Sequence, residues 1–265
     1  KTHPSDVNSY AAAGDLYTNL KDLKKANEYY EKALIYATQS YPLYLQLMDN
    51  SFNLRDFEQV TRYSEQALES YPTQPVLYLY QGMGYKEMKQ MDQAIKAFKV
   101  GQGILVDNEK LEYEFWSKLG ETYHQLEQYE LSDQAFDKAM EINGLDAYLL
   151  NNYSYYLSLR KEKLEKAEEM VKTANDLFPN NASFNDTYGW ILYQQGKFVE
   201  AEKWIKKSLS NGGENSGTVL EHYGDVIYKL NKEDARALEY WNRAKVTGEY
   251  SDLLDKKIKE GKNEE

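Results

Sequence analysis

The chain contains no cysteine, and it has only five prolines and three histidines among its 265 residues. Without cysteine it has no disulfide framework, no thiolate zinc site and no cysteine nucleophile. With 15 glycines and so few prolines, it lacks the turn signals that a β-sandwich or barrel needs about every ten residues. No apolar run approaches the roughly 20 residues that cross a bilayer. These absences favour a helical protein without a membrane-spanning segment.

Basic residues are also scarce relative to acidic ones. Lysine and arginine total 32 and aspartate and glutamate 43, so the net charge is −11. Nucleic acids and anionic membranes bind proteins with a surplus of basic side chains, because their phosphates are negatively charged. The excess of acidic residues therefore argues against both as partners. Tyrosine, by contrast, is abundant, with 25 copies. This abundance requires an explanation.

An aromatic residue, a small residue four positions later and a tyrosine three positions after that recur along the chain. The pattern is clear in Tyr78, Gly82 and Tyr85. The small residues of successive copies lie 34 to 38 residues apart, with Met48 filling the second slot: Gly14, Met48, Gly82, Gly120, Ser154, Gly189 and Gly224. Such a period indicates a repeat architecture.

Each copy is followed by a second signature, in which a small residue precedes an aromatic or aliphatic one by four positions and another small one by seven. Ala94, Phe98 and Gly101 are an example. Offsets of three and four place residues on one helical face, so each unit is predicted to be a pair of amphipathic helices. The small residue of the first helix is expected to let the second helix approach closely.

This period and pattern resemble the tetratricopeptide repeat (TPR) family, most clearly in residues 116–123 and 134–139. The resemblance implies an all-α, right-handed α-α superhelix, a TPR solenoid of about seven helix-turn-helix repeats plus a C-terminal capping helix. The expected repeats are 7–40, 41–74, 75–112, 113–146, 147–181, 182–216 and 217–250. Departures from the pattern are Ser51 in place of a tyrosine, four extra residues near 105–110, and single extra residues near 160–162 and 232–234.

Two segments flank the repeats. Residues 1–6 are read as an N-terminal extension, and residues 251–265 as a capping helix and tail. We expect Ser251 to cap the N-terminus of a helix from Asp252 to about Lys259. Leu254 and Ile258 then lie on one side and cover the final apolar face.

A narrower resemblance concerns residues 150–158, 166–170, 186–192, 221–225 and 238–241. These segments are similar to the C-terminal half of exported TPR proteins, putative lipoproteins, of Bacteroidetes-type bacteria. That resemblance implies a bacterial protein that is exported and periplasmic or outer-membrane associated. A lipid anchor ahead of Lys1 is one option, and a cytoplasmic location is the alternative.

Residues that carry chemistry are few. His3, His124 and His222 fall in different parts of the chain, so we expect no metal site and interpret His124 and His222 as exposed helix residues. The glycine-rich segment 212–218 has neither the preceding strand nor the following lysine of a phosphate-binding loop, and is interpreted as a linker. The sequence therefore predicts no catalytic residue, no metal and no cofactor, and we expect that the protein is not an enzyme.

A solenoid instead offers a concave surface formed by the first helix of each pair. Helical register predicts these partner-binding residues there: Asn19, Asp49, Asn53, Met83, Glu121, His124, Asn151, Asn152, Tyr155, Asp186, Trp190, Tyr193, Asp225 and Tyr228. Acidic side chains outnumber basic ones among them, and the aromatic ones gather in the last three repeats.

The charge of this surface indicates the chemistry of its partner. TPR proteins that bind chaperones hold a carboxylate with a basic clamp, which this chain does not reproduce. We expect a neutral or basic protein or peptide segment, and therefore a non-catalytic interaction scaffold. Two alternatives stay open, namely the repeat region of a larger protein whose enzymatic or anchoring part is absent, and a glycan or envelope-polymer binding module that stacks sugars on the aromatic side chains.

Overall fold

The computed structural model describes residues 7–231 and 235–263. The predicted extension 1–6, the predicted extra residue near 232–234 and the last two residues lie outside this part. All regular elements in the described ranges are helices, which confirms the predicted all-α class. The chain divides into two compact units, residues 1–142 and 143–265.

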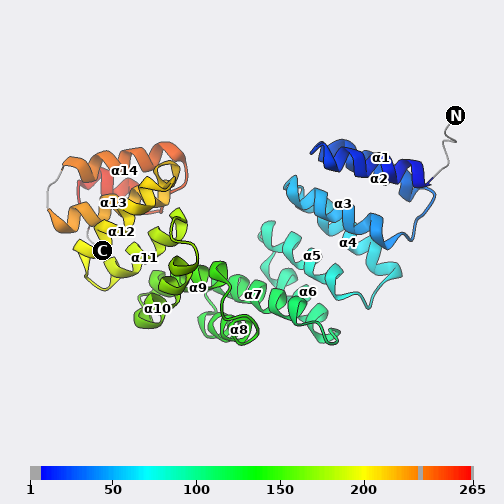
Figure 1. Cartoon of the computed structure of the whole chain (residues 1–265), viewed down its shortest axis with the longest axis horizontal. Helices are drawn as coiled ribbons and strands as arrows, with labels where there is room; N and C mark the ends of the chain where they lie inside the picture. Colours follow the sequence, from blue (N-terminus) through cyan, green and yellow to red (C-terminus); the bar gives the residue numbers. More distant parts are fainter. Residues whose placement is uncertain (1–6, 232–234, 264–265) are drawn as a thin grey trace. The chain divides into compact units, whose positions relative to one another are not determined.

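Helices follow one another in pairs within each unit (Figure 1). Unit 1 contains α1 (Val7–Asn19), α2 (Leu23–Leu34), α3 (Tyr41–Asn53), α4 (Phe57–Ser70), α5 (Pro75–Glu87), α6 (Met91–Gly103), α7 (Glu109–Gln125) and α8 (Tyr129–Ile142). Unit 2 contains α9 (Ala147–Arg160), α10 (Leu164–Leu177), α11 (Ala182–Gln194), α12 (Phe198–Ser210), the 3-10 turn η1 (Gly213–Asn215), α13 (Gly217–Leu230), α14 (Ala235–Thr247) and α15 (Leu254–Glu260). The described helices thus form seven pairs and one further C-terminal helix.

The first helices of successive pairs also contact each other: α3 contacts α5 and α5 contacts α7 in unit 1, while α9 contacts α11 and α11 contacts α13 in unit 2. Their shared side is called the first-helix face below. It carries the predicted partner-binding positions of each unit.

Close approach within a pair depends on the small residue of its first helix, as predicted. A Cβ on Gly82 would overlap the ring of Phe98 in the second helix, and a Cβ on Gly120 would lie 2.9 Å from Phe136. Gly14 meets Tyr30 in the same way. Real Cβ atoms do not come this near, so the helices of these pairs pack only because the side chain is missing.

The turn within a pair repeats as well. At its end the first helix places one residue in the left-handed region, with φ of 61° at Lys21 and 59° at Arg55. The next N–H bonds back to a carbonyl five residues earlier, as Asp22 does to Tyr17 and Asp56 to Ser51, both at 2.9 Å. Ser51 occupies the slot that tyrosine fills elsewhere. The turn is intact with serine there because the hydrogen bond uses the backbone carbonyl and not the side chain.

Several tyrosines serve this architecture. Tyr44 and Tyr78 each donate a hydroxyl hydrogen bond to a carbonyl six residues earlier, that of Thr38 and that of Pro72. The side chains of Tyr123, Tyr153 and Tyr223 are buried in the cores of their units: Tyr123 in unit 1 and the other two in unit 2. Much of the tyrosine content is therefore helix packing, because the ring fills the interior while the hydroxyl reaches a polar partner.

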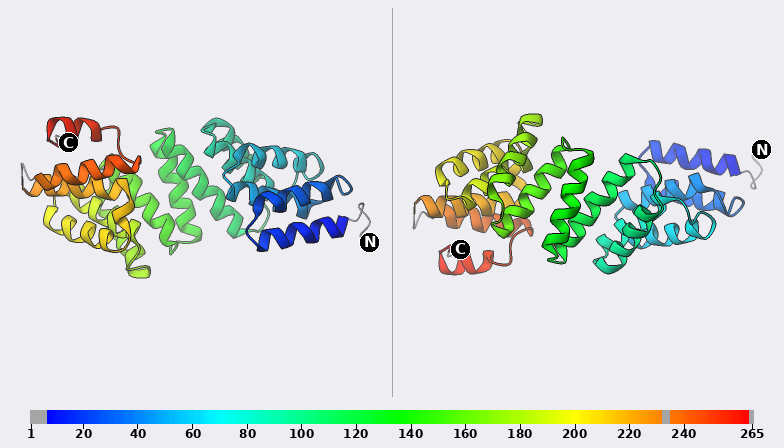
Figure 2. Two further views of the ribbon diagram at one scale, coloured as in Figure 1. Left: turned by 90° about the horizontal axis from the view of Figure 1, so that it is seen from above. Right: turned by 90° about the horizontal axis from the view of Figure 1, so that it is seen from below.

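The C-terminal helix differs from its prediction. It begins at Leu254 and not at Asp252, and Ser251 does not cap it. Both Ser251 hydrogen-bond donors instead go to the carboxylate of Glu221 on α13. In both views of Figure 2, α15 lies beside α14, with which it is in contact.

Candidate functional site

The fourteen predicted partner-binding residues divide by exposure. Asn19, Asp49 and Asn53 are exposed, and Met83, His124, Asn152, Tyr155 and Tyr228 are half-buried. The remaining six are buried: Glu121, Asn151, Asp186, Trp190, Tyr193 and Asp225. Helical register placed all of them on first helices, but it did not distinguish an accessible side chain from one that a neighbour covers.

In unit 1, polar contacts on the first-helix face connect the first helices of neighbouring pairs. Lys86 of α5 pairs with Glu121 of α7 at 2.5 Å, and Lys118 reaches the same carboxylate at 3.2 Å. Burial alone would raise the pKa of Glu121, but the two ammonium groups outweigh it and lower that pKa. Glu121 is therefore an ionised residue already engaged by two lysines.

A cavity of about 680 Å³ in unit 1 was not anticipated from the sequence. Its lining includes Asn27, Glu31, Ser51 and Tyr63. Asn27 donates to the Ser51 hydroxyl at 3.1 Å and accepts from Asn50 at 2.9 Å. Ser51 is thus a polar link between α2 and α3. Tyr85, in the same slot of the next pair, links α5 to α4 by donating its hydroxyl to Glu65 at 2.7 Å.

In unit 2 the predicted aromatic residues stack on one another. The ring centroids of Trp190 and Tyr193 are 4.7 Å apart and those of Trp190 and His222 are 3.9 Å apart, with both pairs nearly parallel. Trp190 is 5% exposed and Tyr193 6%. These two predicted residues are therefore not freely accessible, because neighbouring rings occupy their faces.

The interpretation of His222 as an exposed residue was wrong. Its side chain is buried, and its Nδ1 lies 2.9 Å from the Asp186 carboxylate of the preceding pair. Burial lowers the pKa of His222, but Asp186, with Asp225 and Glu221 further off, outweighs that effect and raises the pKa. The sequence signal for this pair is the spacing, because Asp186 precedes His222 by about one repeat and both lie on first helices.

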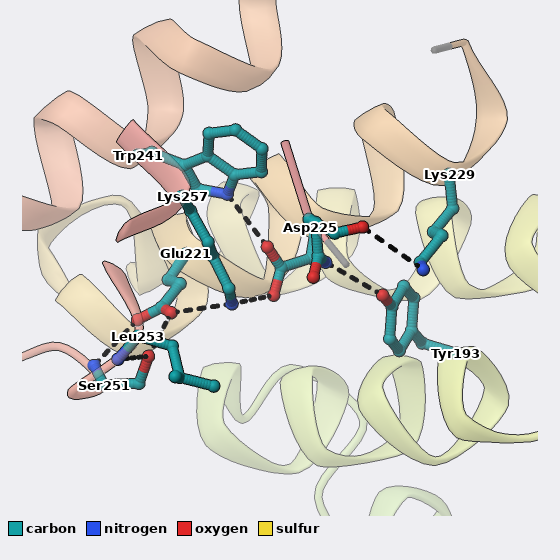
Figure 3. Close-up of polar contacts among 9 residues, drawn as sticks. Tyr193, Glu221, Asp225, Lys229, Trp241, Ser251, Leu253 and Lys257 are labelled. Carbon is teal, nitrogen blue, oxygen red and sulfur yellow. Dashed lines mark hydrogen bonds and ion pairs between the residues drawn. The ribbon is translucent and has the colours of Figure 1, made fainter. Parts of the chain in front are cut away.

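Asp225 and Glu221 hold a lysine from the C-terminal helix (Figure 3). Lys257 Nζ lies 2.7 Å from Asp225 Oδ2 and 2.9 Å from Glu221 Oε1. Asp225 also accepts a hydrogen bond of 2.9 Å from the indole Nε1 of Trp241. Asp225 has no exposed surface, so a partner protein can contact its carboxylate only after Lys257 has moved away.

Burial governs the electrostatics of this cluster. It raises the pKa of Asp225 to about 6, although Lys257 opposes the shift. For Lys257, burial lowers the pKa, but Asp225 and Glu221 outweigh it and raise that pKa. At neutral pH the cluster is therefore one ammonium group between two carboxylates, with little solvent to screen them.

Beyond Lys257, the tail makes a second contact with the first-helix face. Asn263 is buried, and its Nδ2 donates to the hydroxyl of Tyr193 on α11 at 3.0 Å. Ser251 was predicted only as a helix cap, and Lys257 and Asn263 were not predicted as contact residues. One signal was present, because Lys257 falls on the same helical face as Leu254 and Ile258, where a charged residue needs a partner.

A cavity of about 580 Å³ adjoins this cluster within unit 2. Its lining includes Tyr155, Trp190, His222, Tyr250, Ser251 and Lys257. The indole Nε1 of Trp190 is buried and has no hydrogen-bond partner among the described residues. The cavity therefore combines aromatic walls with charged groups of both signs, including Glu221, Asp225 and Lys257.

Residues 7–231 and 235–263 contain neither a candidate metal centre nor a candidate membrane span. No group of three or more metal-ligating side chains was found there. None of the helices in these ranges is both long and apolar enough to cross a membrane.

Comparisons with known proteins relate two segments of the chain to a repeat family. The tetratricopeptide repeat family model matches residues 7–35 and 113–144. A TPR repeat-containing protein of Pseudomonas aeruginosa is 30% identical over 149 residues, which are 56% of this chain and 24% of that protein. The type IV pilus assembly protein PilF of the same organism is 24% identical over 166 residues, which are 62% of this chain and 64% of PilF. The chain thus spans about a quarter of the length of the first relative and just under two thirds of the length of PilF.

Among solved structures, a tetratricopeptide repeat protein from Parabacteroides merdae has a TM-score of 0.73 at 16% identity, covering 96% of this chain and 97% of that one. This likeness concerns the fold. The family model thus matches two segments of this chain, and the fold as a whole is similar to that of a tetratricopeptide repeat protein.

Proposed function

We propose that the protein is a non-catalytic scaffold that binds a peptide or protein segment along the first-helix face. The observation that carries this proposal is the cavity of about 580 Å³ on that face of unit 2, lined by Tyr155, Trp190 and His222 and bordered by Glu221 and Asp225. Aromatic walls with a few polar groups are typical of sites that hold a partner side chain. The similarity to a pilus assembly protein is consistent with a protein that binds other proteins.

The partner we propose is neutral or basic. Carboxylates border the cavity in unit 2, and Asp49 is exposed on the first-helix face of unit 1. The net charge of −11 adds a general attraction for basic segments. Complementary charge increases the association rate and selects partners more than it increases affinity.

A peptide array graded from acidic to basic, probed with the full chain, tests the proposal. Asp49→Lys on α3 reverses a charge on the first-helix face, and Glu58→Lys on α4 makes the same change on a second helix. Both side chains are exposed, so neither change disturbs a core. We expect Asp49→Lys to weaken the basic signals and Glu58→Lys to leave them unchanged. Equal effects of both variants, or a signal only from acidic peptides, would contradict the proposal.

The alternative of a larger protein has one observation in its favour. The chain spans 24% of one relative and 22% of another, the human protein O-mannosyl-transferase TMTC1, to which it is 25% identical over 199 residues. The same scaffold would then serve an attached domain. The complete gene sequence tests this, as cell fractionation tests the predicted export and lipid anchor.

The glycan-binding alternative has lost its main support, because sugar stacking needs a free aromatic face. Trp190 and Tyr193 stack on protein neighbours, which leaves only the half-buried Tyr155 and Tyr228. A glycan array run beside the peptide array serves as its test.

A further inference from the structure

Leu254 of α15 is buried in the apolar core of unit 2, and Ile258 packs against that core. Polar contacts join α15 and the residues that flank it to the first-helix face. Ser251 and Lys257 bind Glu221, Lys257 also binds Asp225, and Asn263 binds Tyr193 (Figure 3). Among α15 residues only Leu254 and Lys257 are buried. The helix has seven residues, too few to be stable without its contacts. Its attachment therefore resembles the binding of a short peptide.

The residues that hold it, Glu221, Asp225 and Tyr193, all lie on the first-helix face of α11 and α13. Asp225 has no exposed surface, and Glu221 is 4% exposed. Two neighbouring buried carboxylates are costly unless a cation pairs with them. Lys257 is the cation that both carboxylates contact, so this part of the face is matched to a bound ammonium group.

Helix α15 leaves space beside it. The cavity of about 580 Å³ is lined by Lys257 and Ser251 on the side of the C-terminal segment and by Tyr155 and Trp190 on the other side. The indole Nε1 of Trp190 has no acceptor within the described part of the chain. A helix that served only to cover the last repeat leaves no reason for an unmatched donor and an open cavity next to its lysine.

We propose that Glu221 and Asp225 form a lysine-recognition site, in which Lys257 is the resident ligand until a lysine-bearing helical segment of a partner replaces α15. The partner's lysine takes the place of Nζ of Lys257, an apolar residue three positions earlier takes that of Leu254, and its flanking groups enter the cavity toward Trp190. This inference rests on the proposed scaffold function and specifies its partner and its regulation.

The test uses the full chain and a synthetic peptide with the sequence of residues 249–263. The Lys257→Glu variant places a third carboxylate beside Glu221 and Asp225, so repulsion releases α15 and frees the site. We expect the peptide to bind this variant at least roughly tenfold more tightly than it binds the wild type, because a tethered segment competes at an effective concentration near millimolar. Titration calorimetry measures both affinities.

Three controls make the test specific. Lys256→Glu changes the charge equally on an exposed side chain of the same helix, and is expected to behave as the wild type. A peptide carrying glutamate at the position of Lys257 should not bind. A designed helical peptide that shares with α15 only a leucine and a lysine three residues later should bind the Lys257→Glu variant, as a partner would.

Circular dichroism and thermal unfolding establish that the variant is folded. Should Lys257→Glu fail to fold, Lys257→Met keeps the apolar stem and removes only the charge, and the same tighter binding relative to wild type is expected. Equal affinity of the peptide for wild type and for the folded variant, or no binding to either, would overturn the inference. Neither outcome touches the scaffold proposal, whose test on Asp49 lies in unit 1.

Discussion

Single side chains on the first-helix face are coupled to partners one repeat away. His222 and Asp186 are separated by 36 positions along the chain and pair at 2.9 Å. Around His222 lie Trp190 and Tyr155, whose rings are 3.9 and 6.4 Å from its ring, while Asp225 and Glu221 contribute further negative charge. Burial and an acidic surrounding act on this imidazole in opposite directions, and the acidic surrounding prevails.

We therefore predict that the pKa of His222 is raised above its ordinary value in the folded protein, and that Asp186→Asn lowers this pKa. Proton NMR of the imidazole signals against pH measures it, with His222→Gln to assign the resonance. Since the folded pKa exceeds the unfolded one, this pair stabilises the fold fully below about pH 6.5 and loses its contribution as pH rises through the folded value. An unchanged midpoint in Asp186→Asn would show that Asp186 does not set the charge of His222.

Helix pairs are the elements that the sequence pattern describes best. The glycine of the first helix, the aromatic or aliphatic residue about sixteen positions later and the left-handed turn between them recur in both units. Each feature acts over a short stretch of chain, so one sequence is sufficient to predict it. Helix α15 is the exception, because its start and its bonds depend on Glu221 and not on its own sequence.

The glycine rule predicts a contrast between two substitutions in unit 1. Gly82→Ala forces a Cβ into the ring of Phe98, and we expect it to destabilise the protein by about 1–3 kcal/mol. Gly103→Ala, at the end of α6, meets nothing within 4 Å and should be neutral or stabilising by up to about 1 kcal/mol.

Urea unfolding of the two variants and the wild type provides the comparison. Similar midpoints for Gly82→Ala and Gly103→Ala would mean that α5 and α6 do not need the missing side chain for their approach.

At the scale of the whole molecule, the relevant property is the net charge of −11, which is a sum over the entire chain. It acts over distances comparable to the screening length, about 10 Å at 0.1 M salt. A basic segment is therefore attracted before it makes any contact, whereas the buried Lys257 cluster acts only after contact.

We predict that raising sodium chloride from 20 to 500 mM lowers the association rate of a lysine-rich peptide from the array by roughly tenfold and changes its dissociation rate less. Stopped-flow or surface plasmon resonance measures both rates, with a glutamine-for-lysine version of the peptide as control. If both peptides respond equally to salt, or neither does, charge is not what guides the partner.

The sequence by itself determined the repeat, the helix pairs, the glycine positions and the helical face of each predicted residue, because all of these follow from spacings of 3, 4 and about 35 residues. The tertiary structure alone decided which of those residues are accessible. Trp190, Tyr193 and Asp225 are buried by His222, Asn263 and Lys257, and the contact between Asn263 and Tyr193 spans 70 positions. Helical register assigns a side chain to a face of its helix, but only folding brings a distant segment of chain to cover that face. The position of Lys257 between Glu221 and Asp225 was therefore visible in the structure alone.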